Sequence, residues 1–415
     1  MRKLLSVLLA AAFMLSAVGL LAACGGGGGD EQADAVADKV AAAQNMTDEE
    51  LIALAKEESG KFIAYGNSSR IVDAMNGFVT KYGTQIGLSS SNATASKLDD
   101  SSIYQTITTE ATAVDKSSAA SMVLVQDSAT LSQYREQTTL LTNYIPKGMD
   151  EVMGENDMVP LAHQYINKLF IWNNTGSEVP SFTNVWELTE EKYRDEKGEG
   201  KIFFKSPTSE QVNMNFLIML TSDEWSGKLE TAYKAWNDNA AATDVGEGKT
   251  YPTYGHKWIT EFLTNCNFKI NSDTKIAQNL SAKENDDKVG LFVLSKLRDS
   301  SVVADNLQVA AWANKTGETY TKIEPFAGFM YALYAQIVTN GPRPYTAMLF
   351  VNYLMTEEGF SPWASMGGYS ANSSIPVTDG DSTLSFWRDT LVFEDGAYIK
   401  SVKTEMVDYI NKIIG

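Results

Sequence analysis

The spacing of apolar residues predicts alternating helices and strands from residue 47 onward. In "RIVDAMNGFVTKYG" apolar residues recur at i, i+1, i+4, i+7, i+8 and i+11, which is one face of a helix that Gly83 closes. Thr47 and Glu50 form a capping box that begins an earlier helix. Strands are predicted at 61–65, 84–90, 121–127, 168–174, 200–206 and 288–295, and helices at 95–113, from 128, and at 209–221, 223–240 and 253–264. This alternation predicts an α/β fold with a mainly parallel sheet.

The first residues have the pattern of a secretory leader. A short positive start, Met1 to Lys3, precedes an apolar run, and Leu21-Ala22-Ala23-Cys24 resembles the bacterial lipobox. This resemblance implies a lipoprotein signal peptide over 1–23 and lipidation of Cys24, which would hold the protein at the outer face of the cell membrane. The glycines and polar residues that follow predict a flexible tether over 24–46. An uncleaved transmembrane helix is the alternative.

Charge and composition exclude several functions. The chain has 415 residues, enough for two domains, and a net charge of −18, or about −20 without residues 1–23. Such a surface repels nucleic acid and favours a soluble monomer. The sequence contains no G-x-S-x-G, HExxH or P-loop motif, and only His163 and His256 are available to a His-dependent site. We therefore expect no enzyme, cofactor or metal, with a surface hydrolase as an outside alternative.

Polar loops that lead from strands into helices are the candidate binding sites. In parallel sheets ligands collect beyond the carboxyl ends of the strands, and a helix N-terminus accepts an anion. Opposed helix starts from two lobes would clamp a small oxyanion. The residues of these loops are Gly66, Asn67, Ser68, Ser69, Arg70, Ser91, Asn92, Ser206, Thr208 and Ser209. A simple N-cap role for the serines is the alternative.

Four stretches in the same order resemble one protein family across roughly residues 47–380. They are "EELIALAKEESGKFIAYGNSSRIVDAMNGFVTKYG", "MVLVQDSATLSQY", "LFIWNNTGSEVPSFTNVWELTEEKYRDEKGEGKIFFKSPTS" and "AMLFVNYLMTEEGFSPWASMGGYSANSSIP". The chain resembles an extracellular solute-binding protein of an ABC importer, with a type 2 periplasmic-binding fold. Within that family it is similar to the group of ferric-iron and related anion binders.

The resemblance implies two α/β lobes joined by hinge strands. Each lobe would be a central sheet flanked by helices, the first from 47–168 with 318–366 and the second from 169–317 with 367–415. They would close on a small, anionic solute and deliver it to an ABC permease. The resemblance adds the candidate ligand contacts Asp127, Trp172, Asn173, Lys296 and Arg298.

The chain departs from the iron-binding members of this family. Those members use a tyrosine pair after a strand of the second lobe, where this chain reads "VGLFVLSKLRD", and some use a histidine where Ser69 stands. A ferric site needs several hard oxygen donors, so an anion is favoured over iron. Two alternatives remain open within binding: a sugar or other neutral ligand held by Trp172 and tyrosines, and a ferric-iron site without tyrosines. A separate alternative is an adhesive surface lipoprotein with a shut cleft.

Overall fold

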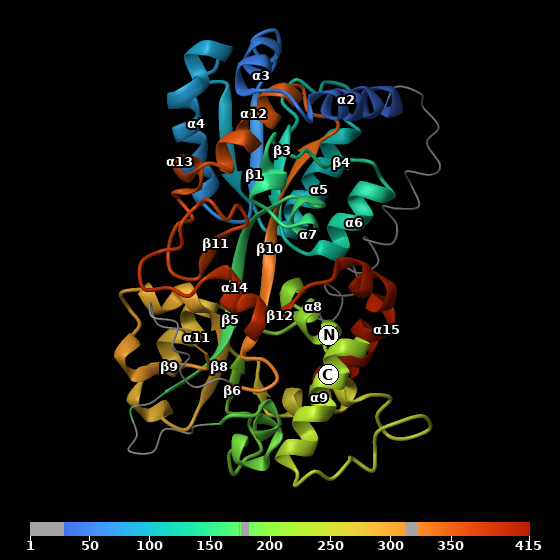
Figure 1. Ribbon diagram of the computed structural model, residues 1–415, viewed down its shortest axis with the longest axis vertical. Coiled ribbons are helices and arrows are strands. Elements are labelled where there is room, and N and C mark those ends of the chain that lie inside the picture. The colour runs from blue at the N-terminus through green and yellow to red at the C-terminus, as the bar shows by residue number, and fades with distance from the viewer. Residues whose placement is uncertain (1–28, 174, 176–181, 312–322) are drawn as a thin grey trace, which may run out of the picture.

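The computed structural model describes residues 29–173, 175, 182–311 and 323–415 (Figure 1). The predicted signal peptide and Cys24 lie outside these residues. Helices and strands alternate as predicted, and the capping box at Thr47 and Glu50 is present at the start of α3 (Asp48–Ala55). The α/β fold class is therefore confirmed.

The first part of the chain forms parallel strands separated by helices. In order these elements are β1 (Phe62–Gly66), α4 (Arg70–Ile86), β2 (Ala93–Lys97), α5 (Asp100–Ala111), β3 (Met122–Val125) and α6 (Ser128–Glu136). The strand predicted at 84–90 is wrong. Helix α4 continues to Ile86, which is buried on the same face as Tyr82, and ends at Gly87 with φ 69°. The strand that follows is β2, which begins at Ala93.

A long strand, β5 (Ala162–Asn173), carries the chain into the second part. The elements there are β6 (Ile202–Phe204), α8 (Gln211–Met219), α9 (Asp223–Trp236), α10 (Tyr254–Thr264), β7 (Cys266–Asn267), α11 (Asp273–Leu280), β8 (Val289–Val293) and β9 (Leu307–Val309). The chain then returns through β10 (Gly328–Val338), α12 (Pro344–Leu354), α13 (Glu357–Phe360), β11 (Gly368–Ser370), α14 (Leu384–Thr390), β12 (Val392–Phe393) and α15 (Gly396–Ile414).

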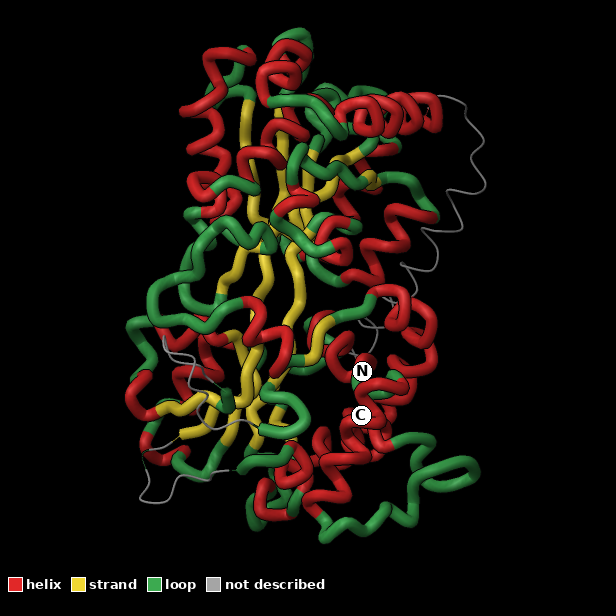
Figure 2. The backbone as a smooth tube through the Cα atoms, in the orientation of Figure 1, coloured by secondary structure: helices red, strands yellow, loops and turns green. Residues whose placement is uncertain are grey.

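Two halves of one sheet define the architecture. The strand order is β2-β1-β3-β10-β5-β8-β6-β7, with β1, β2 and β3 parallel on one side and β6, β7 and β8 parallel on the other. Figure 1 shows helices around both halves, and Figure 2 shows the strands running along the axis of the molecule. We call the half with β1–β3, α4–α6 and α12 the first lobe, and the half with β6–β8, α8–α11 and α15 the second lobe.

Strands β5 and β10 run through both lobes. The first residues of β5 pair with the end of β10, where Ala162 lies opposite Tyr334, and its last residues pair with β8, where Trp172 lies opposite Val289. An antiparallel pair of this length is the structural basis for a hinge. The predicted lobe boundaries, with the first crossing between 168 and 169, stay a prediction.

The predicted flexible tether is wrong for Gly29–Ala43, because these residues form helix α2. Val36, Val40 and Ala43 recur at i, i+4 and i+7 and are buried in the core. Helix α2 packs against α12, and the ammonium of Lys39 lies 5.7 Å from the ring centroid of Tyr345. The prediction of a tether was based on the run of glycines and overlooked this apolar stripe. The folded body therefore begins before Thr47.

Candidate functional site

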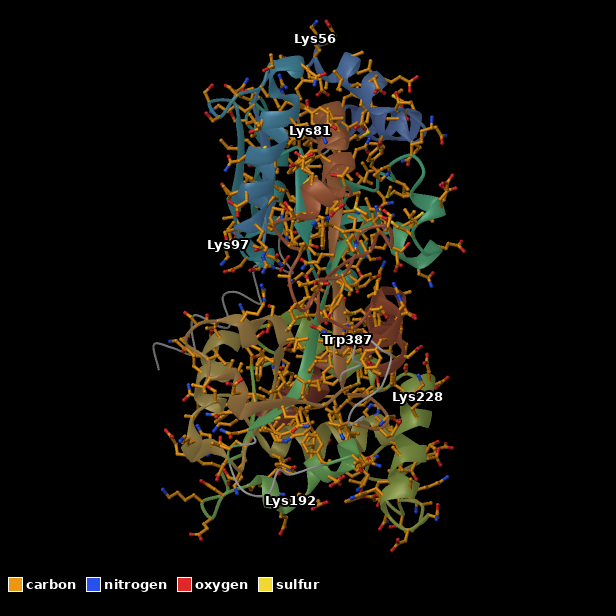
Figure 3. The ribbon with its side chains drawn as sticks, turned by 60° about the vertical axis from the view of Figure 1, so that its left-hand side comes forward. Lys56, Lys81, Lys97, Lys192, Lys228 and Trp387 are labelled. Atoms are coloured by element: carbon orange, nitrogen blue, oxygen red, sulfur yellow. The ribbon has the colours of Figure 1, made fainter. Side chains whose placement is uncertain are left out.

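Three loops of the first lobe meet at its carboxyl edge. Asn67, in the loop between β1 and α4, donates from Nδ2 to Oδ2 of Asp100 at 3.3 Å. The backbone N–H of Gln126, after β3, donates to the other oxygen of Asp100 at 2.8 Å. Figure 3 places Lys97, the last residue of β2, at the border of the first lobe that faces the second lobe. The predicted loop Gly66–Arg70 therefore lies at the interlobe edge.

Arg70 faces a like charge from the other lobe. It is the first residue of α4, whereas Arg298 ends a short 3₁₀ helix, Leu294–Arg298, that follows β8 in the second lobe. Burial and the nearby charge of Arg298 lower the pKa of Arg70. Within the part of the chain that the structure describes, neither guanidinium has a hydrogen bond or an ion pair. An anion that contacts both forks would relieve this repulsion.

The charge of Arg298 also acts on Asp381, whose oxygens are used within the fold. One accepts from the N–H of Gly367 at 2.7 Å, and the other from the hydroxyl of Tyr369 at 2.7 Å. Burial raises the pKa of Asp381, and the charge of Arg298 opposes that shift. Lys296, on the same 3₁₀ helix as Arg298, is half-buried, and its charge acts on Asp299, so its predicted ligand contact stays a prediction.

The hinge strand β5 carries a buried lysine, Lys168. Nζ of Lys168 lies 2.6 Å from Glu210, 2.9 Å from Oδ1 of Asn213 and 3.3 Å from Asp273. Burial lowers the pKa of Lys168, but the carboxylates of Asp273 and Glu210 outweigh it, so its pKa lies above the ordinary value. Glu210 is the N-cap of α8 and Asp273 is the first residue of α11. The ion cluster thus ties β5 to the starts of two helices.

The predicted helix start at 206–209 is wrong, and the anion clamp predicted at Ser206, Thr208 and Ser209 stays a prediction. Helix α8 begins at Gln211 with Glu210 as its N-cap, so the carboxylate of Glu210 already supplies negative charge at this helix start. The three hydroxyls bond within the loop, and that of Ser209 also donates to Oδ1 of Asn271 at 2.9 Å. Ser206 and Thr208 bond to each other at 2.7 Å, and Ser209 donates to the carbonyl of Ser206 at 2.9 Å.

Ser91 and Asn92 lie at the wrong edge of the sheet. They precede β2 rather than follow a strand, and the N–H of Phe62, at the start of β1, donates to the carbonyl of Asn92 at 2.8 Å. Gly66, at the far end of β1, pairs instead with Lys97. The length of β1 therefore separates this loop from the interlobe edge, and the binding role predicted for both residues is wrong.

Trp172 and Asn173 belong to the core of the second lobe. Both are 0% exposed. The ring of Trp172 packs against Phe182 with centroids 5.2 Å apart. Nδ2 of Asn173 donates to the carbonyls of Leu280 and Ala282 at 2.6 and 2.8 Å. Because neither side chain reaches the interlobe surface, the ligand contacts predicted for them are wrong.

Asp127 lies in a cluster that joins the two lobes. It is 5% exposed, with φ 58°, and caps α6 of the first lobe. Nδ2 of Asn215 in α8 lies 3.0 Å from Oδ1 of Asp127 and 3.0 Å from Oε1 of Glu394. Lys403 of α15 lies 3.2 Å from Oδ2 of Asp127. Sequence reasoning missed Asn215, Glu394 and Lys403. The two asparagines in the otherwise apolar "VNMNFLIML" were the available signal for α8.

Two carboxyl groups beside Asp127 have pKa values above the ordinary range. Burial, with the charge of Asp127 added, raises the pKa of Glu394 to about 7. Burial also raises the pKa of Asp100 to about 6, and Asp127 again contributes. Hydrogen bonds from Asn215 and from Asn67 oppose these shifts without cancelling them. The site therefore has two guanidinium groups at one end and a cluster of buried carboxyl groups at the other.

In residues 29–173, 175, 182–311 and 323–415, no group of three or more His, Cys, Asp or Glu is arranged to hold a metal ion. No helix in these ranges combines the length and the apolar character needed to cross a bilayer.

Comparison with known proteins gives structural matches only. No protein-family model and no curated protein matches the sequence. Among solved structures, the chain is similar to the Trichodesmium protein IdiA (FutA) in complex with iron and citrate, with a TM-score of 0.58 and 14% identity over 85% of this chain and 99% of that one. The ferric binding protein from Campylobacter jejuni also gives 0.58, at 13% identity over 85% and 99%.

A third match binds a different kind of solute. The periplasmic binding protein AfuA from Actinobacillus pleuropneumoniae, with fructose-6-phosphate bound, gives a TM-score of 0.54 and 16% identity over 85% of this chain and 97% of that one. These matches confirm the expected two-lobed, type 2 periplasmic-binding-protein-like architecture. They also confirm that the resemblance read from the sequence, to the group of ferric-iron and related binders, holds at the level of the fold.

Proposed function

We propose that the protein is an extracytoplasmic receptor that captures a small anionic solute between its lobes and delivers it to an ABC permease. The observation that carries this proposal is the pair Arg70 and Arg298, which come from opposite lobes and repel each other. A guanidinium fork suits carboxylate, phosphate or sulfonate groups, which it binds with two parallel hydrogen bonds. The solved structures with this fold are transport proteins, which supports the same role and the absence of catalysis.

Capture would couple to lobe closure. An anion bound to Arg70 favours an approach of Arg298, which repels Arg70 in the absence of ligand. The rotation would be taken up by β5 and β10, the strands shared by both lobes. The ion cluster of Lys168, Glu210 and Asp273 would keep the second lobe rigid against β5 during this motion.

The anchoring proposal rests on the sequence. Lipidation of Cys24 would hold a monomer at the membrane, with residues before α2 as the spacer. Metabolic labelling with a fatty-acid analogue in cells that express the full chain tests it. Label on the wild type and its loss in Cys24→Ala are expected, and label that persists in the variant contradicts it.

Thermal shift and titration calorimetry test the binding proposal. A panel of phosphates, carboxylates, sulfonates, neutral sugars and cations should yield an anionic ligand, since a ligand at 100 times its Kd stabilises the fold by about 2.7 kcal/mol. Arg70→Ala and Arg298→Ala should each weaken that binding at least about tenfold, and the control Lys228→Ala, on the outer helix α9, should not. Unchanged affinity in a folded double variant would refute the proposal, as would tight binding of neutral sugars alone.

A further inference from the structure

The interlobe site has two ends of opposite charge. Arg70 and Arg298 form the positive end, and Asp100, Asp127 and Glu394 form the negative end. Among the described residues, Lys403 is the ammonium in contact with this acidic end, and its partners are Asp127 and Thr130. Glu394 and Asp100 instead receive hydrogen bonds from neutral amide groups. The described residues therefore place one ammonium against three carboxyl groups.

Two buried tyrosines of the hinge strand β10 face these acids. Tyr331 is 3% exposed and Tyr334 is 8% exposed. Burial raises the pKa of Tyr331, and the charges of Glu210, Asp273, Glu394 and Asp100 add to this shift in that order. Burial also raises the pKa of Tyr334, to which Glu394, Tyr165, Asp157 and Asp127 contribute. Neither hydroxyl hydrogen-bonds to any part of the protein that the structure describes. Among the described residues, Oε2 of Glu394 is buried without a hydrogen-bond partner, and a buried polar atom without a partner points to a ligand.

The two ends are close enough for one small molecule. Asn67 contacts Asp100 at 3.3 Å, and Arg70 follows Asn67 by three residues in the same loop. Three residues span at most about 11 Å between their Cα atoms. The side chain of Arg70 can thus approach one end of a solute of a few bonds while Asp100 approaches the other.

We infer that the solute is a zwitterion whose anionic group binds Arg70 and Arg298 and whose protonated amine lies among Asp100, Asp127 and Glu394. This inference rests on the proposed function, because it keeps the anion at the arginine pair. The ammonium donates hydrogen bonds to the carboxylates and to the hydroxyls of Tyr331 and Tyr334, which lack protein partners. It supplies the positive charge that the acidic end lacks.

The raised pKa values of Glu394 and Asp100 support this assignment. A carboxyl keeps its proton when it is buried without an opposite charge, and it gives up that proton when a cation arrives. Binding of a zwitterion should therefore release protons at pH 6–7, where these groups titrate. Calorimetry in buffers of different ionisation enthalpy measures this release.

Matched probe pairs test the inference on the whole protein. The pairs are phosphoethanolamine with ethyl phosphate, taurine with ethanesulfonate, and β-alanine with propionate, and ethylamine is the amine alone. We expect the zwitterion of at least one pair to bind at least about tenfold more tightly than its matched anion. Equal binding within every binding pair would overturn the inference and leave the anion proposal standing. Binding of ethylamine alone, or of no probe, would overturn both.

Variants at the acidic end test the contact with the amine separately from the contact with the anionic group. Glu394→Gln keeps an acceptor for Asn215 but removes the charge, so it should abolish the preference for the zwitterion and leave the matched anion unaffected. Asp100→Asn is a second variant with the same expectation. Tyr331→Phe should reduce the preference in part. The control Glu284→Gln changes an exposed acid outside the site, and a preference that survives in both acid variants would overturn the inference.

Discussion

Nζ of Lys168 lies 2.6 Å from Oε2 of Glu210, so the hinge strand β5 and the N-cap of α8 are joined by an ion pair whose carboxylate is partly exposed. Lys168 itself is 0% exposed. A buried pair adds little when compared with apolar replacements, but loss of one partner leaves a charge without compensation. The ion pair of Lys168 and Glu210 therefore contributes mainly by holding the second lobe against the hinge strand β5.

Removal of this ammonium should destabilise the protein strongly. We expect Lys168→Met to lower the free energy of unfolding by about 3–5 kcal/mol, because Glu210 and Asp273 lose their shared counter-charge. Urea denaturation monitored by tryptophan fluorescence measures it. The double variant Lys168→Met/Glu210→Gln should recover part of the loss. Lys192→Met, on the surface, should change stability by less than about 0.5 kcal/mol, and a similar loss in both single variants would contradict the prediction.

Stability should fall as the pH rises toward neutrality. The folded pKa of Glu394 is about 7 against an ordinary value of 4.5, so the native state binds more protons than the unfolded state between these values. The contribution of Glu394 is complete below pH 4.5 and is lost by about pH 7, and its upper limit is roughly 3 kcal/mol. Denaturation curves at pH 5, 6, 7 and 8 should show this slope, and Glu394→Gln should flatten it. An equal slope in the variant would refute the assignment to Glu394.

Helix α2 should contribute to folding stability. Val40 is 1% exposed, and its truncation in Val40→Ala should cost about 1–3 kcal/mol. The neighbouring exposed Asp38 is the matched control, since Asp38→Ala removes no buried contact. Equal stability of the two variants would mean that this segment behaves as the tether that the sequence predicted.

A glycine positions the segment that carries Arg298. Gly367 has φ 79°, and a Cβ there would lie 2.9 Å from the backbone N of Ser295. Gly367→Ala should therefore destabilise the protein by more than about 1 kcal/mol and weaken anion binding. Gly87→Ala is the matched control, because Gly87 has φ 69° with open space around it. Gly87→Ala should therefore show only the destabilisation that comes from backbone strain. Equal effects of Gly367→Ala and Gly87→Ala on anion binding would contradict the positioning role.

Several elements follow from local sequence alone. The apolar stripe from Ile71 to Tyr82 identifies α4, and the capping box at Thr47 and Glu50 marks the start of α3. Such signals depend on residues within a few positions of one another, so no tertiary contact is needed to read them. The prediction from local sequence failed at Ile86 and Leu88, because apolar residues at this spacing fit the period of a strand as well as that of a helix. That single error moved Ser91 and Asn92 to the wrong edge of the sheet.

The binding site depended on the tertiary structure. The sequence indicated Arg70, Asp127 and Arg298 as separate candidates, but strand order alone brings Arg70 near Arg298 and Asp127 near Asn215 and Glu394. Burial also depends on the tertiary structure. Trp172 is enclosed in the core, whereas Arg298 is exposed at the interlobe site. Hydrophobic periodicity is a property of neighbours along the chain and is legible in the sequence. Which loops face one another is set by how two sheet halves join through β5 and β10, and only the folded chain decides it.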